Sequence, residues 1–231
     1  MKRIILLAAL VFSACQAQTV TPTSQTAELA VSNETEAIAN SAVASKLLIS
    51  SRGIGQAKLG MTLGQLKKIS NQDTQFEVIL SFTADVNAIA VVKEEVVQYY
   101  ILSSVDDDSE SNQAIDAEDK VITALMTNND KYQTDLGVKV GTPIKEAEDV
   151  YGDAILAYNT ERESGEYVTF GSNNPENISF KASYFKLISD GLGFSGIYPE
   201  YPGVSYTTDK YRDDAAIAAI EVSCGSKDCI R

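Results

Sequence analysis

The sequence contains no histidine among its 231 residues and only three cysteines. Histidine is the most frequent general base and a common metal ligand, so its absence excludes a Ser-His-Asp triad, a Cys-His pair and a conventional zinc site within this chain. Two carboxylates suffice for glycosidase chemistry, but the number of acidic residues does not locate such a pair. We therefore expect a protein that is not an enzyme and that requires no cofactor.

Basic residues are also scarce, with 19 lysines and arginines against 32 aspartates and glutamates, which gives a formal net charge of −13. This charge repels the phosphate groups of nucleic acids and of anionic lipids. We therefore expect no nucleic-acid partner. The folded body would need a separate anchor to stay at a membrane.

The apolar run near the start, Ile4–Phe12, is shorter than the ~20 residues that a transmembrane helix needs. Two basic residues precede it and two small residues follow it, which is typical of a secretory signal. Cys15 comes next, and the segment resembles a lipobox, the motif at which bacteria cleave before a cysteine and acylate it. Phe12 departs from the usual leucine of that motif. Gln16, after the cysteine, favours the outer membrane over the inner one.

We therefore predict a signal peptide at residues 1–14, followed by an acylated Cys15 and a flexible tether through residue 46. Residues 16–45 support the tether because they are rich in polar and small residues and contain no aromatic residue. The implied location is the outer membrane, facing the periplasm, with attachment through the lipid. The alternative is ordinary cleavage near Ala17, which would leave a soluble periplasmic protein.

A first helix is predicted after Thr62, because Thr62 and Gln65 have the spacing of a capping box. Leu63, Leu66 and Ile69 fall on one face of this helix. Strand-like runs then follow at residues 76–82, 88–92, 96–102 and 121–126.

A second helix-start pattern occurs 80 residues after Thr62. Thr142 is the predicted N-cap, Pro143 suits the first helical turn and Gly152 is a suitable stop. The apolar spacing of the first helix recurs at Ile144, Ala147 and Val150. Strand-like runs again follow, at residues 155–158, 167–170, 178–184 and 217–224.

This repetition predicts an α+β fold made of two related halves, residues 47–130 and 131–231, each a short capped helix packed on antiparallel strands. The alternative is two unrelated helix caps, since Gly-x-Thr starts are common.

The segment Gly137–Pro143, with the helix after it, resembles part of the sigma-E-regulated bacterial outer-membrane lipoprotein family of unknown function. Gly53–Gly55, Ile178–Phe180 and Ala219–Val222 are similar to that family in order and spacing. More loosely, Leu59–Thr62 looks like the helix-opening motif of small envelope lipoproteins that assist outer-membrane assembly, and of a β-lactamase-inhibitor-like fold. The resemblance implies a lipoprotein connected with envelope stress and carries over no catalytic residue. The C-terminal cysteine pair departs from the family pattern.

Cys224 and Cys229 lie close together near the end of the sequence. In the oxidising periplasm we expect them to form a disulfide that closes a small loop. Because the loop is short, its stabilisation should be below the ~3 kcal/mol of a 15-residue loop. A redox role is the alternative, although the spacing is not Cys-x-x-Cys.

Residues 185–206 are rich in glycine, proline and aromatic residues, which predicts a long loop. Its aromatic side chains are of the kind that is enriched at protein interfaces. The predicted interaction residues are Phe194, Tyr198, Tyr201 and Tyr206. The alternative is a loop that folds back over its own sheet and buries these rings.

Asp106–Asp108 and Glu110, followed by Asp116, Glu118 and Asp119, form an acidic cluster with oxygen ligands that suit Ca²⁺. The spacing and the central glycine of an EF-hand are missing. A solvated hairpin loop is therefore expected, and no metal site is predicted.

Together these patterns predict a non-enzymatic, periplasm-facing envelope lipoprotein that binds another envelope protein. The first alternative is a module that binds a small ligand or Ca²⁺, through the concave side of a sheet or through the acidic cluster. The second is a hydrolase with an unrecognised acidic pair.

Overall fold

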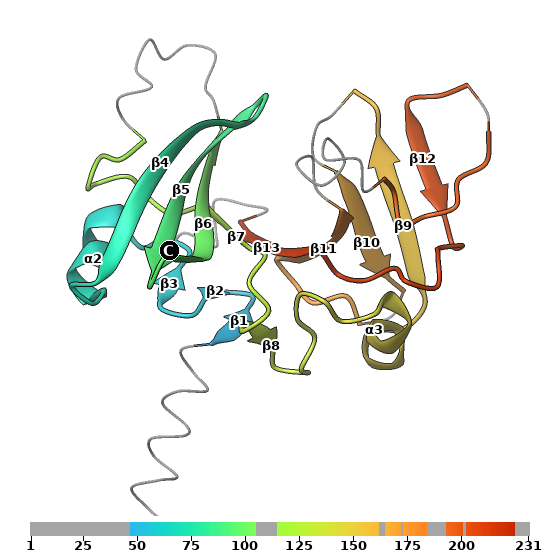
Figure 1. Ribbon diagram of the computed structural model, residues 1–231, viewed down its shortest axis with the longest axis horizontal. Helices are drawn as coiled ribbons and strands as arrows, with labels where there is room; N and C mark the ends of the chain where they lie inside the picture. Colours follow the sequence, from blue (N-terminus) through green and yellow to red (C-terminus); the bar gives the residue numbers. More distant parts are fainter. Residues whose placement is uncertain are drawn as a thin grey trace, which may run out of the picture. The chain divides into compact units, whose positions relative to one another are not determined.

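The computed structural model describes residues 47–104, 115–161, 165–171, 173–183, 193–200 and 202–224. All of them lie in the unit Ser41–Arg231, and they form two sheets and two helices (Figure 1). The fold of this part of the chain is α+β, as predicted, and consists mostly of strands.

The large sheet has nine described strands, and each is antiparallel to its neighbours. In spatial order they are β12 (Ser205–Thr208), β9 (Ala154–Asn159), β10 (Glu166–Phe170), β11 (Ile178–Ser183), β13 (Ala219–Ser223), β7 (Ala124–Thr127), β6 (Val96–Ser104), β5 (Val86–Lys93) and β4 (Thr74–Thr83). The small sheet contains β3 (Ala57–Lys58), β2 (Gly53–Ile54), β1 (Leu48–Ser50) and β8 (Gln133–Thr134).

The eight predicted strand runs all overlap strands of the large sheet, with ends that differ by a few residues. β12 and the strands of the small sheet were not predicted. They are only two to four residues long, which is too short for an alternating apolar pattern to be recognised. These segments are strands because they pair with neighbouring strands, and not because of a pattern in their own sequences.

Helix α2 (Leu63–Ile69) begins with the predicted capping box. Thr62 Oγ1 accepts a hydrogen bond from the Gln65 backbone N–H at 3.2 Å, and Gln65 Oε1 accepts one from the Thr62 N–H at 2.9 Å. Leu63 and Leu66 are buried as expected, but Ile69 is 52% exposed. The prediction for Ile69 was wrong, because Ile69 is the last residue of the helix and its side chain does not pack in the core.

Helix α3 (Ile144–Tyr151) has Pro143 rather than Thr142 as its N-cap, so the prediction for Thr142 was wrong. Pro143 itself is extended, with ψ = 138°, and forms an isolated β-bridge with Ala216, so the helix begins one residue later than predicted. The Thr142 Oγ1 instead accepts a hydrogen bond from the Lys139 backbone N–H at 3.0 Å, within a turn that precedes the helix. Gly152 ends the helix with φ = 90°, as predicted. Among the described residues, no helix is long and apolar enough to cross a bilayer.

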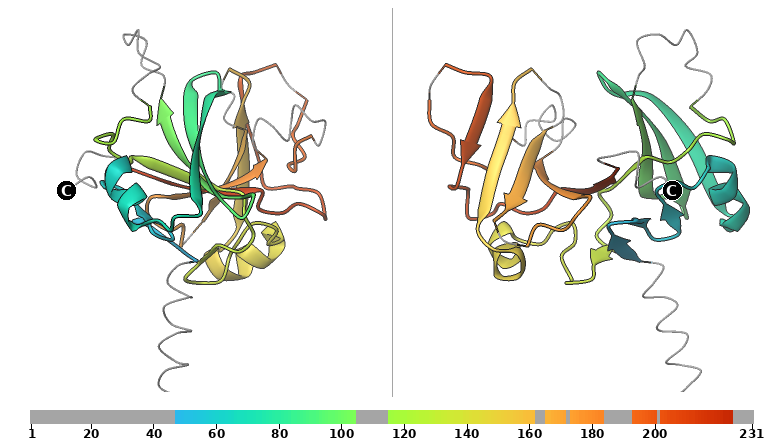
Figure 2. Two further views of the ribbon diagram at one scale, coloured as in Figure 1. Left: turned by 60° about the vertical axis from the view of Figure 1, so that its left-hand side comes forward. Right: turned by 180° about the vertical axis from the view of Figure 1, so that it is seen from behind.

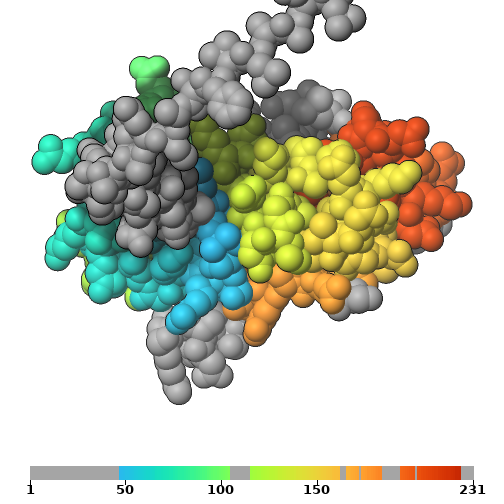
Figure 3. Space-filling model, turned by 90° about the horizontal axis from the view of Figure 1, so that it is seen from below, coloured from blue at the N-terminus to red at the C-terminus, as the bar shows by residue number. Residues whose placement is uncertain are grey.

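Apolar side chains on one face of the large sheet pack against the helices and the small sheet. Phe180 of β11 and Ile220 of β13 are fully buried on this side. Tyr151 of α3 lies against the rings of Phe170 and Phe180, with centroids 5.5 and 5.3 Å away. Its hydroxyl donates to Thr134 Oγ1 of β8 at 2.9 Å. Figure 3 looks at this side, where the N-terminal strands (blue) lie beside residues of the second half (yellow).

The two predicted halves share one continuous sheet. β7 and β13 pair in its middle, where Leu125 lies opposite Val222. β6, β5 and β4 extend the sheet on one side of this pair, and β11, β10, β9 and β12 extend it on the other. The two ends rise on the same side of the central strands (Figures 1 and 2). We call the face between these two ends the concave face; the helices lie on the opposite face.

The β5–β6 hairpin has a strained turn, which leads to the first prediction. Glu94 and Glu95 form its two-residue loop with φ of 52° and 62°, a left-handed conformation that side chains disfavour and that Asn-Gly adopts readily. The double substitution Glu94→Asn/Glu95→Gly should raise the free energy of unfolding by about 1–2 kcal/mol, measured by urea denaturation. The control Glu94→Gln/Glu95→Gln removes the same charges and keeps the strain. An equal gain in both variants would attribute the effect to charge and contradict the prediction.

Candidate functional site

The concave face of the large sheet carries a cavity of about 570 Å³. Its lining comes from β4, β5, β6, β7, β13, β11 and β10 and from the residues beside them, so strands on both sides of the central β7–β13 pair contribute to it. The lining residues are Phe82, Thr83, Asp85, Val86, Leu102, Ser103, Ser104, Thr123, Ala124, Met126, Tyr167, Lys181 and Glu221. This volume lies in the range of ~300–1,000 Å³ that is typical of ligand pockets.

A charged pair lies on the floor of this cavity. Lys181 Nζ of β11 is 3.1 Å from Glu221 Oε2 of β13, and the two side chains are only 8% and 18% exposed. Successive side chains of a strand point to opposite faces. Because Phe180 and Ile220 enter the core, the neighbouring Lys181 and Glu221 point to the concave face.

Lys181 keeps its proton in this setting. Burial by itself would lower the pKa of the ammonium group, but the adjacent Glu221 carboxylate and the Tyr167 side chain together more than offset this effect. The net result is a raised pKa. Lys181 Nζ also lies 4.8 Å from the centre of the Tyr167 ring. A lysine that is charged and paired is a poor nucleophile, so this arrangement favours recognition over covalent chemistry.

The wall of the cavity beside β4 includes Phe82, and the strand is irregular there. The β4–β5 pairing shifts between Ile79 and Thr83, and Ser81 has φ = 53° while its N–H donates to Asn87 Oδ1 at 2.8 Å. Bulges of this kind change the direction of the following side chains. Phe82 then lies against Tyr100, with ring centroids 5.0 Å apart, and borders the cavity.

The predicted aromatic interaction residues are placed elsewhere, around Tyr158 of β9. The Tyr158 ring stacks on Phe194 at 4.1 Å and on Tyr206 at 4.8 Å, and Tyr198 meets it edge-on at 4.6 Å. All three predicted rings are half-buried. The described residues of this segment thus pack over their own sheet, which is the alternative that the sequence left open.

Glu166 of β10 holds this loop in place. It is fully buried, and its carboxylate accepts hydrogen bonds from the N–H groups of Ser195 and Gly196 at 2.8 and 2.7 Å. It also accepts one from the Tyr198 hydroxyl at 2.7 Å. Burial, and then the bond to Glu166, raise the pKa of Tyr198 far above its usual range.

The structure therefore gives Phe194, Tyr198 and Tyr206 a role in packing, and their role in binding a partner stays a prediction. It brings none of them into the concave-face cavity. Sequence reasoning missed Lys181 and Glu221, although each is the one charged residue of its strand, and a single charge in such a run is a usable signal.

Several predicted residues lie outside the described part of the chain: Cys15, Tyr201, Cys229, Asp106–Asp108 and Glu110. Cys224 is disulfide-bonded, while its predicted pairing with Cys229 is not tested. Within the described ranges, no group of three or more acidic or cysteine residues is arranged to hold a metal ion.

No protein-family model matches this sequence, and no curated protein matches it. Among solved structures, the chain is similar to the crystal structure of the uncharacterized protein yfeY from Escherichia coli. The sequence identity is 15% and the TM-score is 0.44, over 76% of this chain and 99% of the other.

The buried Glu166 gives the second prediction. Glu166→Gln would turn an amide NH₂ group toward backbone N–H groups that need an acceptor, so the free energy of unfolding should fall by about 2–3 kcal/mol. The comparison is Glu77→Gln, an exposed position on β4, which should change stability by less than about 0.5 kcal/mol. Similar urea midpoints for the two variants would show that Glu166 does not hold the loop.

Proposed function

We propose that this chain is a non-enzymatic lipoprotein of the cell envelope that binds another protein in the concave face of its large sheet. The observation that carries the proposal is the 570 Å³ cavity with the Lys181–Glu221 pair on its floor. No helix in the described part of the chain covers this face (Figure 1). A pocket that is lined by both apolar and polar side chains and has a charged pair on its floor suits an inserted side chain with an apolar stem and a polar tip.

Two further properties favour a protein over a free small molecule. Ile155 of β9 is 48% exposed, and it points to the concave face because its neighbours Ala154 and Leu156 enter the core. The apolar surface thus continues beyond the cavity, as it does around the central residues of protein interfaces. The net charge of −13 favours a partner with a basic docking surface.

A small ligand is the second candidate, and the size of the cavity is what favours it. Such a ligand would occupy the same pocket and pair with the same charged groups. The two candidates differ in the area of the sheet that they would contact: a protein would also cover the surface around the cavity, whereas a small ligand would contact the cavity alone.

The remaining parts of the proposal rest on the sequence. We propose that Cys15 is acylated and holds the protein at the outer membrane, facing the periplasm, and that the chain is related to the sigma-E-regulated lipoproteins.

We also propose that the two halves are related copies. The order of elements supports this, because α2 is followed by β4, β5, β6 and β7, and α3 by β9, β10, β11 and β13, in equivalent places on either side of the central pair.

The third prediction tests the docking face with a photo-crosslinking residue at Thr123, an exposed residue on the rim of the cavity. In intact envelopes this position should capture one protein specifically. Lys145, an exposed residue of α3 on the opposite face, is the matched control position. The capture should be lost with Lys181→Met/Glu221→Leu, because replacing both charges with apolar groups of similar size preserves folding better than removing one.

Equal capture from both positions would contradict a docking site on the concave face. Capture at Thr123 that survives the double substitution would leave the charged pair without a role in recognition. A cavity that takes up only small molecules, with no protein captured, would favour the second candidate.

The fourth prediction concerns the anchor. Cys15→Ala removes the thiol that would be acylated, so the protein should no longer incorporate labelled palmitate in growing cells. Ser13→Ala, a neighbouring change that keeps the cysteine, should still incorporate the label. Equal incorporation in the two variants, or none in the unaltered chain, would argue against acylation of Cys15.

A further inference from the structure

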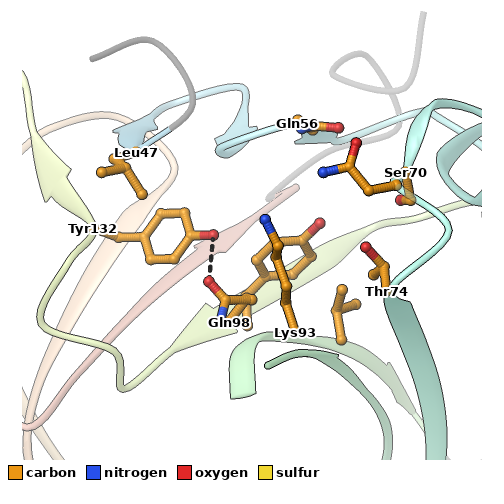
Figure 4. Close-up of a pocket in the computed structure, with 10 residues that line it drawn as sticks. Leu47, Gln56, Ser70, Thr74, Lys93, Gln98 and Tyr132 are labelled. Carbon is orange, nitrogen blue, oxygen red and sulfur yellow. Dashed lines mark hydrogen bonds between the residues drawn. The ribbon is translucent and has the colours of Figure 1, made fainter. Parts of the chain in front are cut away.

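A second, smaller cavity of about 240 Å³ lies on the other side of the large sheet. It is bounded by β5 and β6, by the segment after α2, and by residues at the small sheet (Figure 4). In Figure 4 the side chains of Tyr132, Gln98 and Lys93 gather on one side of it, and Gln56, Ser70 and Thr74 on the other.

A bulge in β6 shapes this cavity. Val91 of β5 pairs with Tyr99, but Val92 pairs with Val97, so that Gln98 is an extra residue in β6. Adjacent residues of a regular strand point to opposite faces, whereas a bulge lets Gln98 and Tyr99 line the same cavity. Gln98 is fixed there, because its Oε1 accepts from the Tyr132 hydroxyl at 3.3 Å and its Nε2 donates to the Val96 carbonyl at 2.9 Å.

The Tyr99 hydroxyl is an available donor of this site. Tyr99 is 5% exposed and lines the cavity. Its hydroxyl is not among the buried side-chain atoms that lack a partner in the described residues, so it is accessible from the cavity, where it can bond to water or to a ligand. Burial raises the pKa of Tyr99 above its usual range and that of Tyr132 to about 12. Both phenols therefore remain hydrogen-bond donors at neutral pH.

The other lining groups favour an uncharged ligand. The amides and hydroxyls of Gln56, Ser70, Asn71 and Thr74 can each donate and accept, as the hydroxyl groups of a sugar do. No carboxylate lines the cavity, which disfavours a cation. The one charged lining residue, Lys93, already lies 3.9 Å from an Asp73 oxygen and 3.8 Å from a Glu94 oxygen, which disfavours an anion.

We infer that this cavity binds a single uncharged sugar ring, with the Tyr99 hydroxyl and the Gln98 amide bonded to ligand hydroxyls. The cavity is smaller than the ~300–1,000 Å³ of pockets for drug-sized ligands. A cavity of this size can enclose one pyranose ring but not a longer oligosaccharide. The rings of Tyr99 and Tyr132, edge-to-face with centroids 6.1 Å apart, supply the apolar surface on which the C–H face of a pyranose packs.

The experiment is a titration of the isotope-labelled full chain in detergent micelles with glucose, with N-acetylglucosamine and with inorganic phosphate, followed by NMR. One of the two sugars should shift the amide signals of Gln98, Tyr99 and Tyr132, with phosphate giving no such shift. Tyr99→Phe removes only the free hydroxyl. It should weaken sugar binding roughly 3- to 10-fold without lowering the melting temperature, because no protein hydrogen bond is lost.

Tyr206→Phe is the matched control, since its hydroxyl bonds to the Gly203 carbonyl and Tyr206 does not line this cavity. It should leave sugar binding unchanged. The inference is overturned if neither sugar shifts these signals at concentrations up to about 100 mM, well above a dissociation constant of ~1 mM. It is also overturned if Tyr99→Phe binds as tightly as the unaltered chain, or if phosphate produces the larger shift.

Discussion

The antiparallel pairing of β7 with β13 joins the two halves of the chain into one sheet, and the placement of the other groups follows from it. Strand side chains alternate between faces, so once Leu125, Ile220 and Val222 enter the core, their neighbours must point the other way. Met126 and Glu221 reach the concave face for this reason. The core and the cavity are two consequences of one strand register.

The Lys181–Glu221 pair has a meaning beyond stability. Replacing a buried ion pair with apolar residues of similar size is often neutral or stabilising, because taking two charges out of water is costly. The pair is therefore weak evidence for stability, which leaves room for the role in selectivity that we propose. Its position on a cavity floor, on a face that no described helix covers, is what connects it with recognition. Glu166 differs from this pair, because each of its observed side-chain hydrogen bonds comes from the loop residues Ser195, Gly196 and Tyr198 and serves to hold that loop.

Local signals in the sequence predicted local structure well. The Thr62–Gln65 capping box and the Gly152 stop depend only on neighbouring residues, and both are present. The N-cap of α3 was misplaced by one residue because Pro143 is extended and bridges to Ala216, a contact that the local sequence does not reveal. The candidate site could not be predicted in the same way. Lys181 and Glu221 meet through strand pairing, and Gln98 and Tyr99 share a cavity because of a bulge that no spacing rule reveals.

β13 belongs to the last described part of the chain, yet it lies in the middle of the nine-stranded sheet. β7 and β11 therefore lack a neighbour until residues 219–223 are available to pair. Contacts between segments so distant in sequence slow folding, because a long loop must close before they form. If the chain is exported as we propose, this order of assembly would let most of the polypeptide be translocated before the sheet closes. Folding would then be completed on the far side of the inner membrane.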